Sequence, residues 1–130
     1  MNNTEAFQTS LSPWLSVRNS KKAVAFYSEA FNAVETYRIE DPDGNAVVQL
    51  SVNGAAFWLS DTPADNDNAE NIGGGTVRMI LTVADPDTVF AQAVKAGATE
   101  VFPVGEEHGW KLGRIADPFG LHWEIGHPLI

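Results

Sequence analysis

The chain has 130 residues, enough for one domain, and its 17 acidic against 8 basic side chains give a formal net charge of −9. This charge disfavours nucleic acids and anionic membranes as partners, and the absence of cysteine excludes thiol catalysis, disulfides and thiolate metal sites. The sequence contains neither a signal peptide nor an apolar run long enough to span a membrane, so it predicts a cytoplasmic protein.

The first half of the chain predicts a strand, a helix and further strands after an N-terminal extension of residues 1–10. Apolar and polar residues alternate around Leu15 and Val17, as in a half-buried strand. Asn19 and Ser20 then provide the start signal of a helix. The apolar face of this helix comprises Ala23, Tyr27, Ala30 and Phe31.

Two turn signals predict hairpins. Residues 41–44 (DPDG) and 117–120 (DPFG) both place Asp, Pro and Gly where a type I turn favours them. We expect the first turn to join the second and third strands of the first half of the chain. The second turn should join the third and fourth strands of the second half. Between these hairpins, residues 61–75 are acidic, rich in Asn and end on three glycines, which indicates a mobile linker.

The second half of the chain contains the clearest helix signals. Asp85 is a favoured N-cap, Pro86 suits the first helical position, and Gly97 suits the residue after the helix. These signals predict a helix over residues 86–96. Its apolar positions are Val89, Phe90, Ala93 and Val94.

A repeat at a spacing of 66 residues relates the two halves. Leu15-Ser16-Val17 is echoed by Leu81-Thr82-Val83, and Phe57-Trp58-Leu59 falls on Trp123-Glu124-Ile125. The sequence therefore predicts an α+β fold of two tandem βαβββ modules, at about residues 11–60 and 76–128. The modules form a single domain over residues 11–130, and neither half should be stable alone.

Two stretches carry a resemblance to a known family. SPWLSVRNSKKAVAFYSEAFNA (residues 12–33) is similar to the opening strand and helix of the vicinal oxygen chelate superfamily, and GRIADPFGLHWEIGHP (residues 113–128) resembles its closing hairpin. That superfamily includes glyoxalases, bleomycin resistance proteins and extradiol dioxygenases. The sequence pattern here resembles that of its PhnB-like branch. The resemblance covers residues 11–128 and implies a mixed sheet that curls around a cleft for a small molecule, in a homodimer.

The resemblance also implies which residues line the cleft. In the family the helices cover one face of the sheet and the other face lines the cleft, so strand alternation sorts the side chains. The core face carries Leu15, Val17, Phe57, Leu59, Trp123 and Ile125. The opposite face carries Ser12, Trp14, Ser16, Trp58, Ser60, Arg78, Ile80, Thr82, His122 and Glu124. The tryptophans and the acidic charge favour an aromatic or cationic ligand.

Metal enzymes of the superfamily hold a divalent ion with four side chains, which correspond here to Ser12, Trp58, Arg78 and Glu124. Only Glu124 is a competent ligand, because an indole and a guanidinium cannot coordinate a cation and a hydroxyl is a poor ligand. No cofactor is therefore predicted and a divalent metal is disfavoured. We expect an ion pair between Glu124 and Arg78, with Arg78 bidentate. A nonstandard metal site on His122 and Glu124 would need His108 or water.

The remaining candidates concern proton transfer and access. His122 and Glu124 share a strand face and are the candidate acid and base of an enzyme. HGWKLGR (residues 108–114) resembles the WGxRxGR segment of the PhnB-like branch, and it makes Trp110 a candidate ligand-binding residue and mobile lid in a loop at 104–112. The alternative for Trp110 is a partly exposed aromatic residue of a hairpin. His108 and His127 are expected to be exposed, in a loop and in the C-terminal tail.

Three classes of function stay open. The leading interpretation is a small-molecule-binding protein without the usual metal. The alternative is a lyase, isomerase or transferase of the superfamily, either metal-dependent or metal-free. In the third, the tryptophans fill a degenerate cleft and the protein acts only through its dimer surface. No dinucleotide fingerprint, P-loop, nucleophile elbow or HExxH motif occurs.

Overall fold

A computed structural model of the chain describes residues 10–61 and 77–129, which form two βαβββ modules. The first module consists of β1 (Trp14–Val17), α1 (Ser20–Phe31), β2 (Val34–Glu40), β3 (Ala46–Val52) and β4 (Ala55–Asp61). The second consists of β5 (Arg78–Thr82), α2 (Pro86–Ala96), β6 (Thr99–Glu107), β7 (Trp110–Ala116) and β8 (His122–Pro128). The predicted α+β class and tandem modules are confirmed. The predicted extension and linker lie, apart from residues 10 and 61, outside the described residues.

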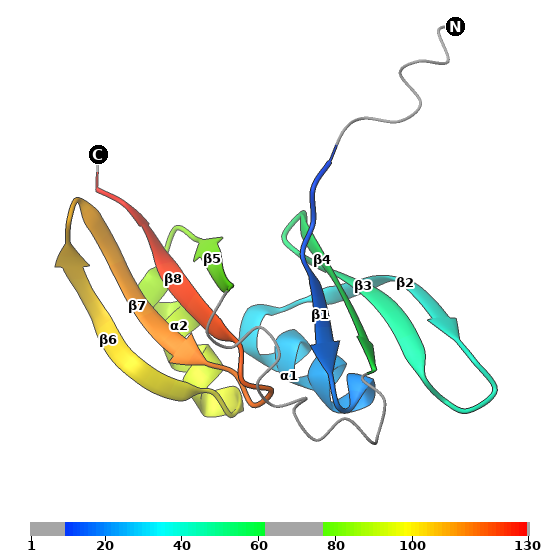
Figure 1. Cartoon of the computed structure of the whole chain (residues 1–130). Coiled ribbons are helices and arrows are strands. Elements are labelled where there is room, and N and C mark those ends of the chain that lie inside the picture. Colours follow the sequence, from blue (N-terminus) through cyan, green and yellow to red (C-terminus); the bar gives the residue numbers. More distant parts are fainter. Residues whose placement is uncertain (1–9, 62–76, 130) are drawn as a thin grey trace, which may run out of the picture.

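Each module builds its own four-stranded mixed sheet, in the orders β1-β4-β3-β2 and β5-β8-β7-β6. The first strand of each module runs parallel to the last strand, and the other neighbours are antiparallel. We expected one curled sheet, and the structure has two four-stranded sheets, one in each module. Figure 1 shows one sheet on either side of the molecule, with α1 and α2 behind them.

Strand register confirms the repeat. Trp14 pairs with Trp58 across β1 and β4, and Ile80 pairs with Glu124 across β5 and β8. Both members of the second pair lie 66 residues after those of the first, since 80 − 14 and 124 − 58 are both 66. Because pairing depends on main-chain geometry, the two modules share a backbone plan although their side chains differ.

The helix boundaries follow from their caps. The Asn19 side chain accepts a hydrogen bond from the Lys22 amide at 3.1 Å and starts α1. Asp85 starts α2 by accepting from the Thr88 amide at 3.3 Å and the Thr88 hydroxyl at 2.7 Å, and the Thr88 hydrogen bonds lower the pKa of Asp85. The predicted range 86–96 for this helix is confirmed. One helix position differs from prediction, since Val94 is exposed.

Both predicted type I turns join the expected strands, Asp41–Gly44 between β2 and β3 and Asp117–Gly120 between β7 and β8. The predicted loop at 104–112 is wrong, because most of these residues belong to the β6–β7 hairpin. Its two-residue turn has positive φ at His108 (52°) and Gly109 (80°), which matches the strand twist of a tight hairpin.

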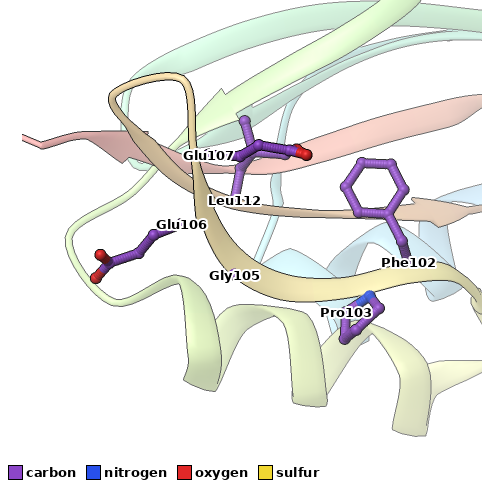
Figure 2. Close-up of a pocket in the computed structure, with 6 residues that line it drawn as sticks. All are labelled: Phe102, Pro103, Gly105, Glu106, Glu107 and Leu112. Atoms are coloured by element: carbon purple, nitrogen blue, oxygen red, sulfur yellow. The ribbon is translucent and has the colours of Figure 1, made fainter.

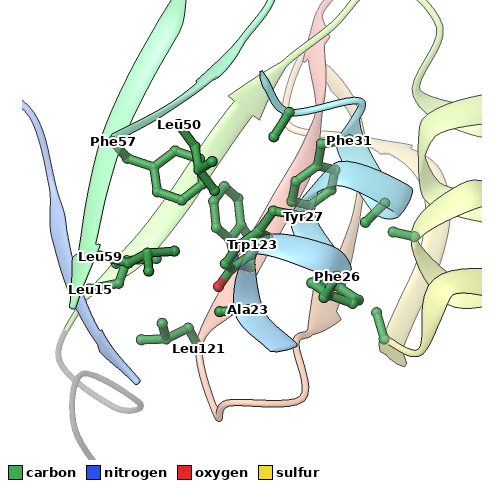
Figure 3. Close-up of a cluster of buried hydrophobic side chains, with 14 of the residues drawn as sticks. Leu15, Ala23, Phe26, Tyr27, Phe31, Leu50, Phe57, Leu59, Leu121 and Trp123 are labelled. Atoms are coloured by element: carbon green, nitrogen blue, oxygen red, sulfur yellow. The ribbon is translucent and has the colours of Figure 1, made fainter. Parts of the chain in front are cut away.

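One aromatic cluster joins the two modules. Trp123 on β8 lies 4.9 Å from Phe31 of α1 and 5.5 Å from Phe57 of β4, measured between ring centroids. Figure 3 shows these rings around Tyr27, with α1 between the sheets. The six predicted core residues of the strands are all buried. The shared cluster supports the expectation that neither module is stable alone, because each would expose aromatic surface without the other.

Asp61 has a structural role that the sequence prediction missed by assigning it to the linker. It ends β4, and its carboxylate accepts hydrogen bonds at 2.8 Å from the Ser20 amide, the Ser20 hydroxyl and the Ala46 amide. Partial burial acts to raise the pKa of Asp61, but the hydrogen bonds from Ala46 and Ser20 together outweigh it and lower the pKa. One carboxylate thus ties β4 to the start of α1 and to β3.

We expect Asp61→Asn to lower the free energy of unfolding at pH 7 by about 1–2 kcal/mol, since it weakens hydrogen bonds to a charged acceptor. The pKa of Asp61 is lower in the folded than in the unfolded chain, so this stabilisation is present above the ordinary pKa of 3.8 and is lost as the pH falls below it. Urea unfolding at pH 7 and pH 3 measures the effect, with exposed Asp43→Asn as control. An equal difference from wild type at both pH values would contradict the prediction.

Candidate functional site

The predicted lining residues lie on the sheet faces opposite the helices and fall into two groups. The first sheet presents an aromatic face, defined by Trp14, Tyr37, Gln49, Trp58 and Ser60. The second sheet presents an arginine face, defined by Arg78, Ile80, Phe102, Arg114, His122 and Glu124. Within the described ranges, no hydrogen bond, ion pair or ring contact joins the two groups. The described contacts of each face therefore lie within its own sheet.

The aromatic face is built on a stacked pair of indoles. The rings of Trp14 and Trp58 lie 5.8 Å apart with 14° between their planes, and Tyr37 meets Trp58 edge-on at 5.6 Å. The Trp14 indole N–H donates to the Ser60 hydroxyl at 2.9 Å, which fixes the ring. Trp14 is nevertheless 54% exposed, so a flat apolar surface is held in place and open to a ligand.

The arginine face centres on Glu124. Its Oε2 atom lies 3.1 Å from Nη2 of Arg114 and 3.4 Å from Nε of Arg78. The predicted Arg78–Glu124 pair is confirmed, but the predicted bidentate geometry is wrong. Arg114 on the neighbouring strand takes the shorter contact with the same oxygen, and Arg78 reaches it from the edge strand β5 with only one nitrogen.

Arg114 was not among the predicted site residues. Its guanidinium lies 5.7 Å from the Phe102 ring centre and contacts Glu124, and its buried Nε has no acceptor within the described parts of the chain. Pairing across the β7–β8 hairpin places it opposite Glu124. A hairpin turn sets the register of its strands, but counting outward from the Asp117–Gly120 turn signal would have put Trp123 opposite Arg114, because the ladder closes on Asp117 and Leu121.

The structure places the other predicted residues as follows. Ser12 precedes β1 and is exposed, so its expected place on the strand is wrong, whereas Ser16 pairs with Ser60 and is half-buried. His122 lies opposite Arg78. His108 is exposed in a turn, as expected.

Two predictions near the C-terminus need correction. Trp110 begins β7 and pairs with Glu107 and Pro128, so a strand holds it and it is not part of a mobile loop. His127 is half-buried within β8, with Nδ1 2.9 Å from the Pro128 carbonyl oxygen, and does not lie in an exposed tail. In both cases the β7–β8 ladder extends further along the chain than the sequence pattern indicated.

Two cavities adjoin these faces. One of about 300 Å³ lies along the β6–β7 hairpin (Figure 2), where Phe102 projects on the side of β6 away from α2. Its lining residues are Phe102, Pro103, Gly105, Glu106, Glu107 and Leu112. The other, of about 470 Å³, lies where the end of β1 meets the β7–β8 turn. The smaller cavity shares Phe102 with the arginine face and extends that face toward the edge of the sheet.

The donor set at the family's metal positions does not fit a divalent cation. Trp58 and Arg78 offer no lone pair, Ser12 lies outside the strand, and Glu124 is already held by two guanidiniums. In the described part of the chain, no three His, Asp or Glu side chains cluster as metal ligands. Nor does any helix there have the length and apolar character to cross a membrane.

Comparisons with known proteins agree with this architecture. The family model of the glyoxalase-like domain matches residues 14–126. An uncharacterized protein of Mycobacterium bovis is 37% identical over 129 residues, covering 94% of this chain and 85% of the relative. The X-ray structure of an Arabidopsis thaliana gene product superposes with a TM-score of 0.70 at 30% identity, covering 93% of this chain and 100% of that one.

A more distant structure shares the fold. TnmS3 from Streptomyces, described as an antibiotic binding protein, gives a TM-score of 0.66 at 19% identity and covers 94% of this chain and 98% of its own. At this identity the likeness shows the fold alone. The match over residues 14–126, the duplicated βαβββ modules and the close relatives lead to one assignment. The chain belongs to the glyoxalase-like family of the vicinal oxygen chelate superfamily.

Proposed function

We propose that the protein binds a small aromatic molecule on the sheet faces opposite its helices, without a divalent metal. The observation that carries this proposal is the stacked Trp14–Trp58 pair, which is fixed by Ser60 and half exposed. An ordered indole surface offers stacking to a flat ligand at little cost in side-chain entropy. The description of TnmS3 as an antibiotic binding protein is consistent with such a role on this fold.

The alternatives have less support. A cationic ligand could stack on the tryptophans, but Glu124 is engaged by two arginines, whose excess positive charge would repel it from the arginine face. The same contacts make Glu124 a poor partner for His122 in acid–base catalysis, because a base needs an accessible lone pair. A degenerate cleft filled by its tryptophans is also disfavoured, since more than half of Trp14 is exposed.

We further propose that the protein is a homodimer, in the cytoplasm. Its outward sheet faces expose an unusual number of large apolar side chains, namely Trp14, Tyr37, Ile39, Ile80 and Phe102. Exposed apolar surface of this kind marks interaction sites in soluble proteins. A second copy placed over these faces would cover this apolar surface and bring an aromatic face opposite an arginine face. Sedimentation equilibrium measures whether the mass in solution is that of a dimer.

A matched set of naphthalene compounds tests the binding proposal: 2-naphthoate, 2-naphthamide and 2-naphthylmethylammonium. We expect at least one of them to raise the melting temperature by about 8 °C at a hundred times its Kd, because a ligand of the native state stabilises by mass action. Trp58→Ala should abolish the rise and Trp58→Phe should keep part of it, with exposed Lys95→Ala as control. Circular dichroism verifies that each variant is folded.

The same assay includes Mn²⁺, Ni²⁺ and Zn²⁺ added to protein treated with a chelator. We expect no stoichiometric stabilisation by any of these ions. A rise with a metal alone, removed by Glu124→Gln, would overturn the metal-free proposal and favour a metal-dependent enzyme. A naphthalene-induced rise that survives Trp58→Ala would place the ligand elsewhere.

A further inference from the structure

We propose that the arginine face selects ligands that carry an anionic oxygen group, such as a carboxylate, on their apolar or aromatic body. This inference rests on the proposed binding function and on the proposed dimer, in which the aromatic face of one copy lies opposite the arginine face of the other, and it names the ligand's charge. Arg78, Arg114 and Glu124 lie on three adjacent strands, β5, β7 and β8, and share one carboxylate oxygen. The sequence alone suggested a cation or a neutral aromatic compound.

The first argument is charge balance. Two guanidiniums carry two positive charges, and Glu124 supplies one negative charge, so the trio holds one uncompensated positive charge. Both ion pairs end on the same Oε2 atom, and Glu124 is only 16% exposed. The whole chain is strongly acidic, with a net charge of −9, and Glu106 and Glu107 line the adjoining cavity, so the positive charge is confined to the trio. A small anion is attracted here, whereas an extended polyanion would be repelled by the surrounding surface.

The second argument is the number of unused donors. A guanidinium has five N–H donors in a planar fork that matches two carboxylate oxygens. Among the described residues Arg78 makes one polar side-chain contact, at 3.4 Å, and with its side chain 55% exposed its other donors face a ligand there. Arg114 is mostly buried, and its Nε has no acceptor among the described residues. A buried donor without an acceptor is unfavourable, so rotation of this guanidinium toward a bound oxyanion would be favoured.

The third argument is the apolar surface beside the charge. Ile80 is 65% exposed and pairs with Glu124 across β5 and β8, and Phe102 lies under the Arg114 guanidinium. The cavity of about 300 Å³ continues from Phe102 toward Leu112. An arginine pair flanked by apolar side chains suits a ligand with a charged end and an apolar body better than it suits inorganic phosphate.

Isothermal titration calorimetry with the three naphthalene compounds tests this selectivity, since they share one aromatic body and carry an anionic, a neutral or a cationic substituent. We expect 2-naphthoate to bind at least ten times more tightly than 2-naphthamide, and 2-naphthylmethylammonium to bind most weakly. Raising the salt concentration should weaken only the naphthoate complex. Inorganic phosphate alone should compete poorly.

Two substitutions locate the effect. Arg78→Gln should weaken naphthoate binding at least tenfold and leave naphthamide binding unchanged, and because Arg78 is exposed we expect this variant to fold. Arg114→Gln should also weaken naphthoate binding and leave naphthamide binding unchanged, with Arg114→Lys as a variant that keeps the charge. Lys95→Gln is the control and should have no effect. Equal affinity for naphthoate and naphthamide would overturn this inference while leaving the binding function standing. If none of the three compounds binds, both proposals fail.

Discussion

Replacing Asp117 by Ala is expected to lower the free energy of unfolding by about 3–5 kcal/mol. Asp117 is buried and accepts four hydrogen bonds, from the Tyr27 hydroxyl at 2.6 Å and from the Trp123 indole, the Phe119 amide and the Leu121 amide at 2.9 Å each. Alanine leaves the Tyr27 and Trp123 donors buried without an acceptor, which costs about 1–3 kcal/mol for each. The change also removes a hydrogen bond that links α1 to the second module.

Urea unfolding monitored by circular dichroism measures this loss. Asp43→Ala in the exposed turn of the first hairpin is the matched control and should change stability by less than about 0.5 kcal/mol. Tyr27→Phe removes one of the four donors and should cost about 1–3 kcal/mol. If Asp117→Ala were no worse than Asp43→Ala, Asp117 would be only a turn residue and its buried hydrogen bonds would contribute nothing.

The environment of Tyr27 agrees with this interpretation. Burial raises the pKa of Tyr27 well above 10, and the charge of Asp117 and the hydrogen bond to it raise the pKa further. A phenol whose pKa is higher in the folded state stabilises the fold fully below pH 10, and this contribution is lost as the pH rises above that value. Tyr27 is therefore a neutral phenol throughout the physiological range, and its hydroxyl donates to Asp117.

Gly126→Ala is expected to destabilise the second sheet by about 3 kcal/mol, at the upper end of the usual cost of overpacking. A Cβ at Gly126 would contact the carbonyl oxygen of Lys111 and would lie 2.5 Å from Cβ and 2.8 Å from Cα of Leu112. Leu112 is the register partner of Gly126 across β7 and β8. These are mostly backbone atoms of a paired strand, so they cannot move without separating the ladder that carries Arg114 and Glu124.

Gly105→Ala is the control for this prediction, because a Cβ there meets no atom within 4 Å and its backbone is extended. Thermal unfolding should show a lower melting temperature for Gly126→Ala and an unchanged or slightly higher one for Gly105→Ala. We also expect the alanine at position 126 to reduce naphthoate binding in the folded fraction. Similar melting temperatures for the two variants would mean that the β7–β8 pairing relaxes easily.

Local sequence rules predicted the elements well. The caps at Asn19 and Asp85, the two type I turns and the six buried strand residues were all found in the sequence and confirmed. Each depends on neighbours within four residues or on the alternation of a strand, so the local pattern is sufficient. The β6–β7 hairpin was mistaken for a loop, because His108 is an uncommon residue at positive φ and its turn signal is weak.

The candidate site was predicted in part. Strand alternation and the 66-residue repeat identified Trp14, Trp58, Arg78 and Glu124 on the faces opposite the helices. Arg114 was missed, because the turn signal does not show that the ladder closes on Asp117 and Leu121, and its presence changed the expected pair into a trio with excess positive charge. The sequence therefore identified side chains of both faces but not the second arginine, which motivates the proposal of an anionic ligand.

By itself the sequence determined the modules, their duplication and the face to which each strand residue points, because periodicity and turn chemistry act over short distances. Tertiary structure alone decided the roles of Asp117 and Asp61, which look like a turn residue and a linker residue in the sequence. The partners of Asp117 include Tyr27, 90 residues away, and those of Asp61 include Ser20, 41 residues away. Such contacts form only when packing brings distant segments together, because the sequence of one segment does not indicate which distant segment it will contact.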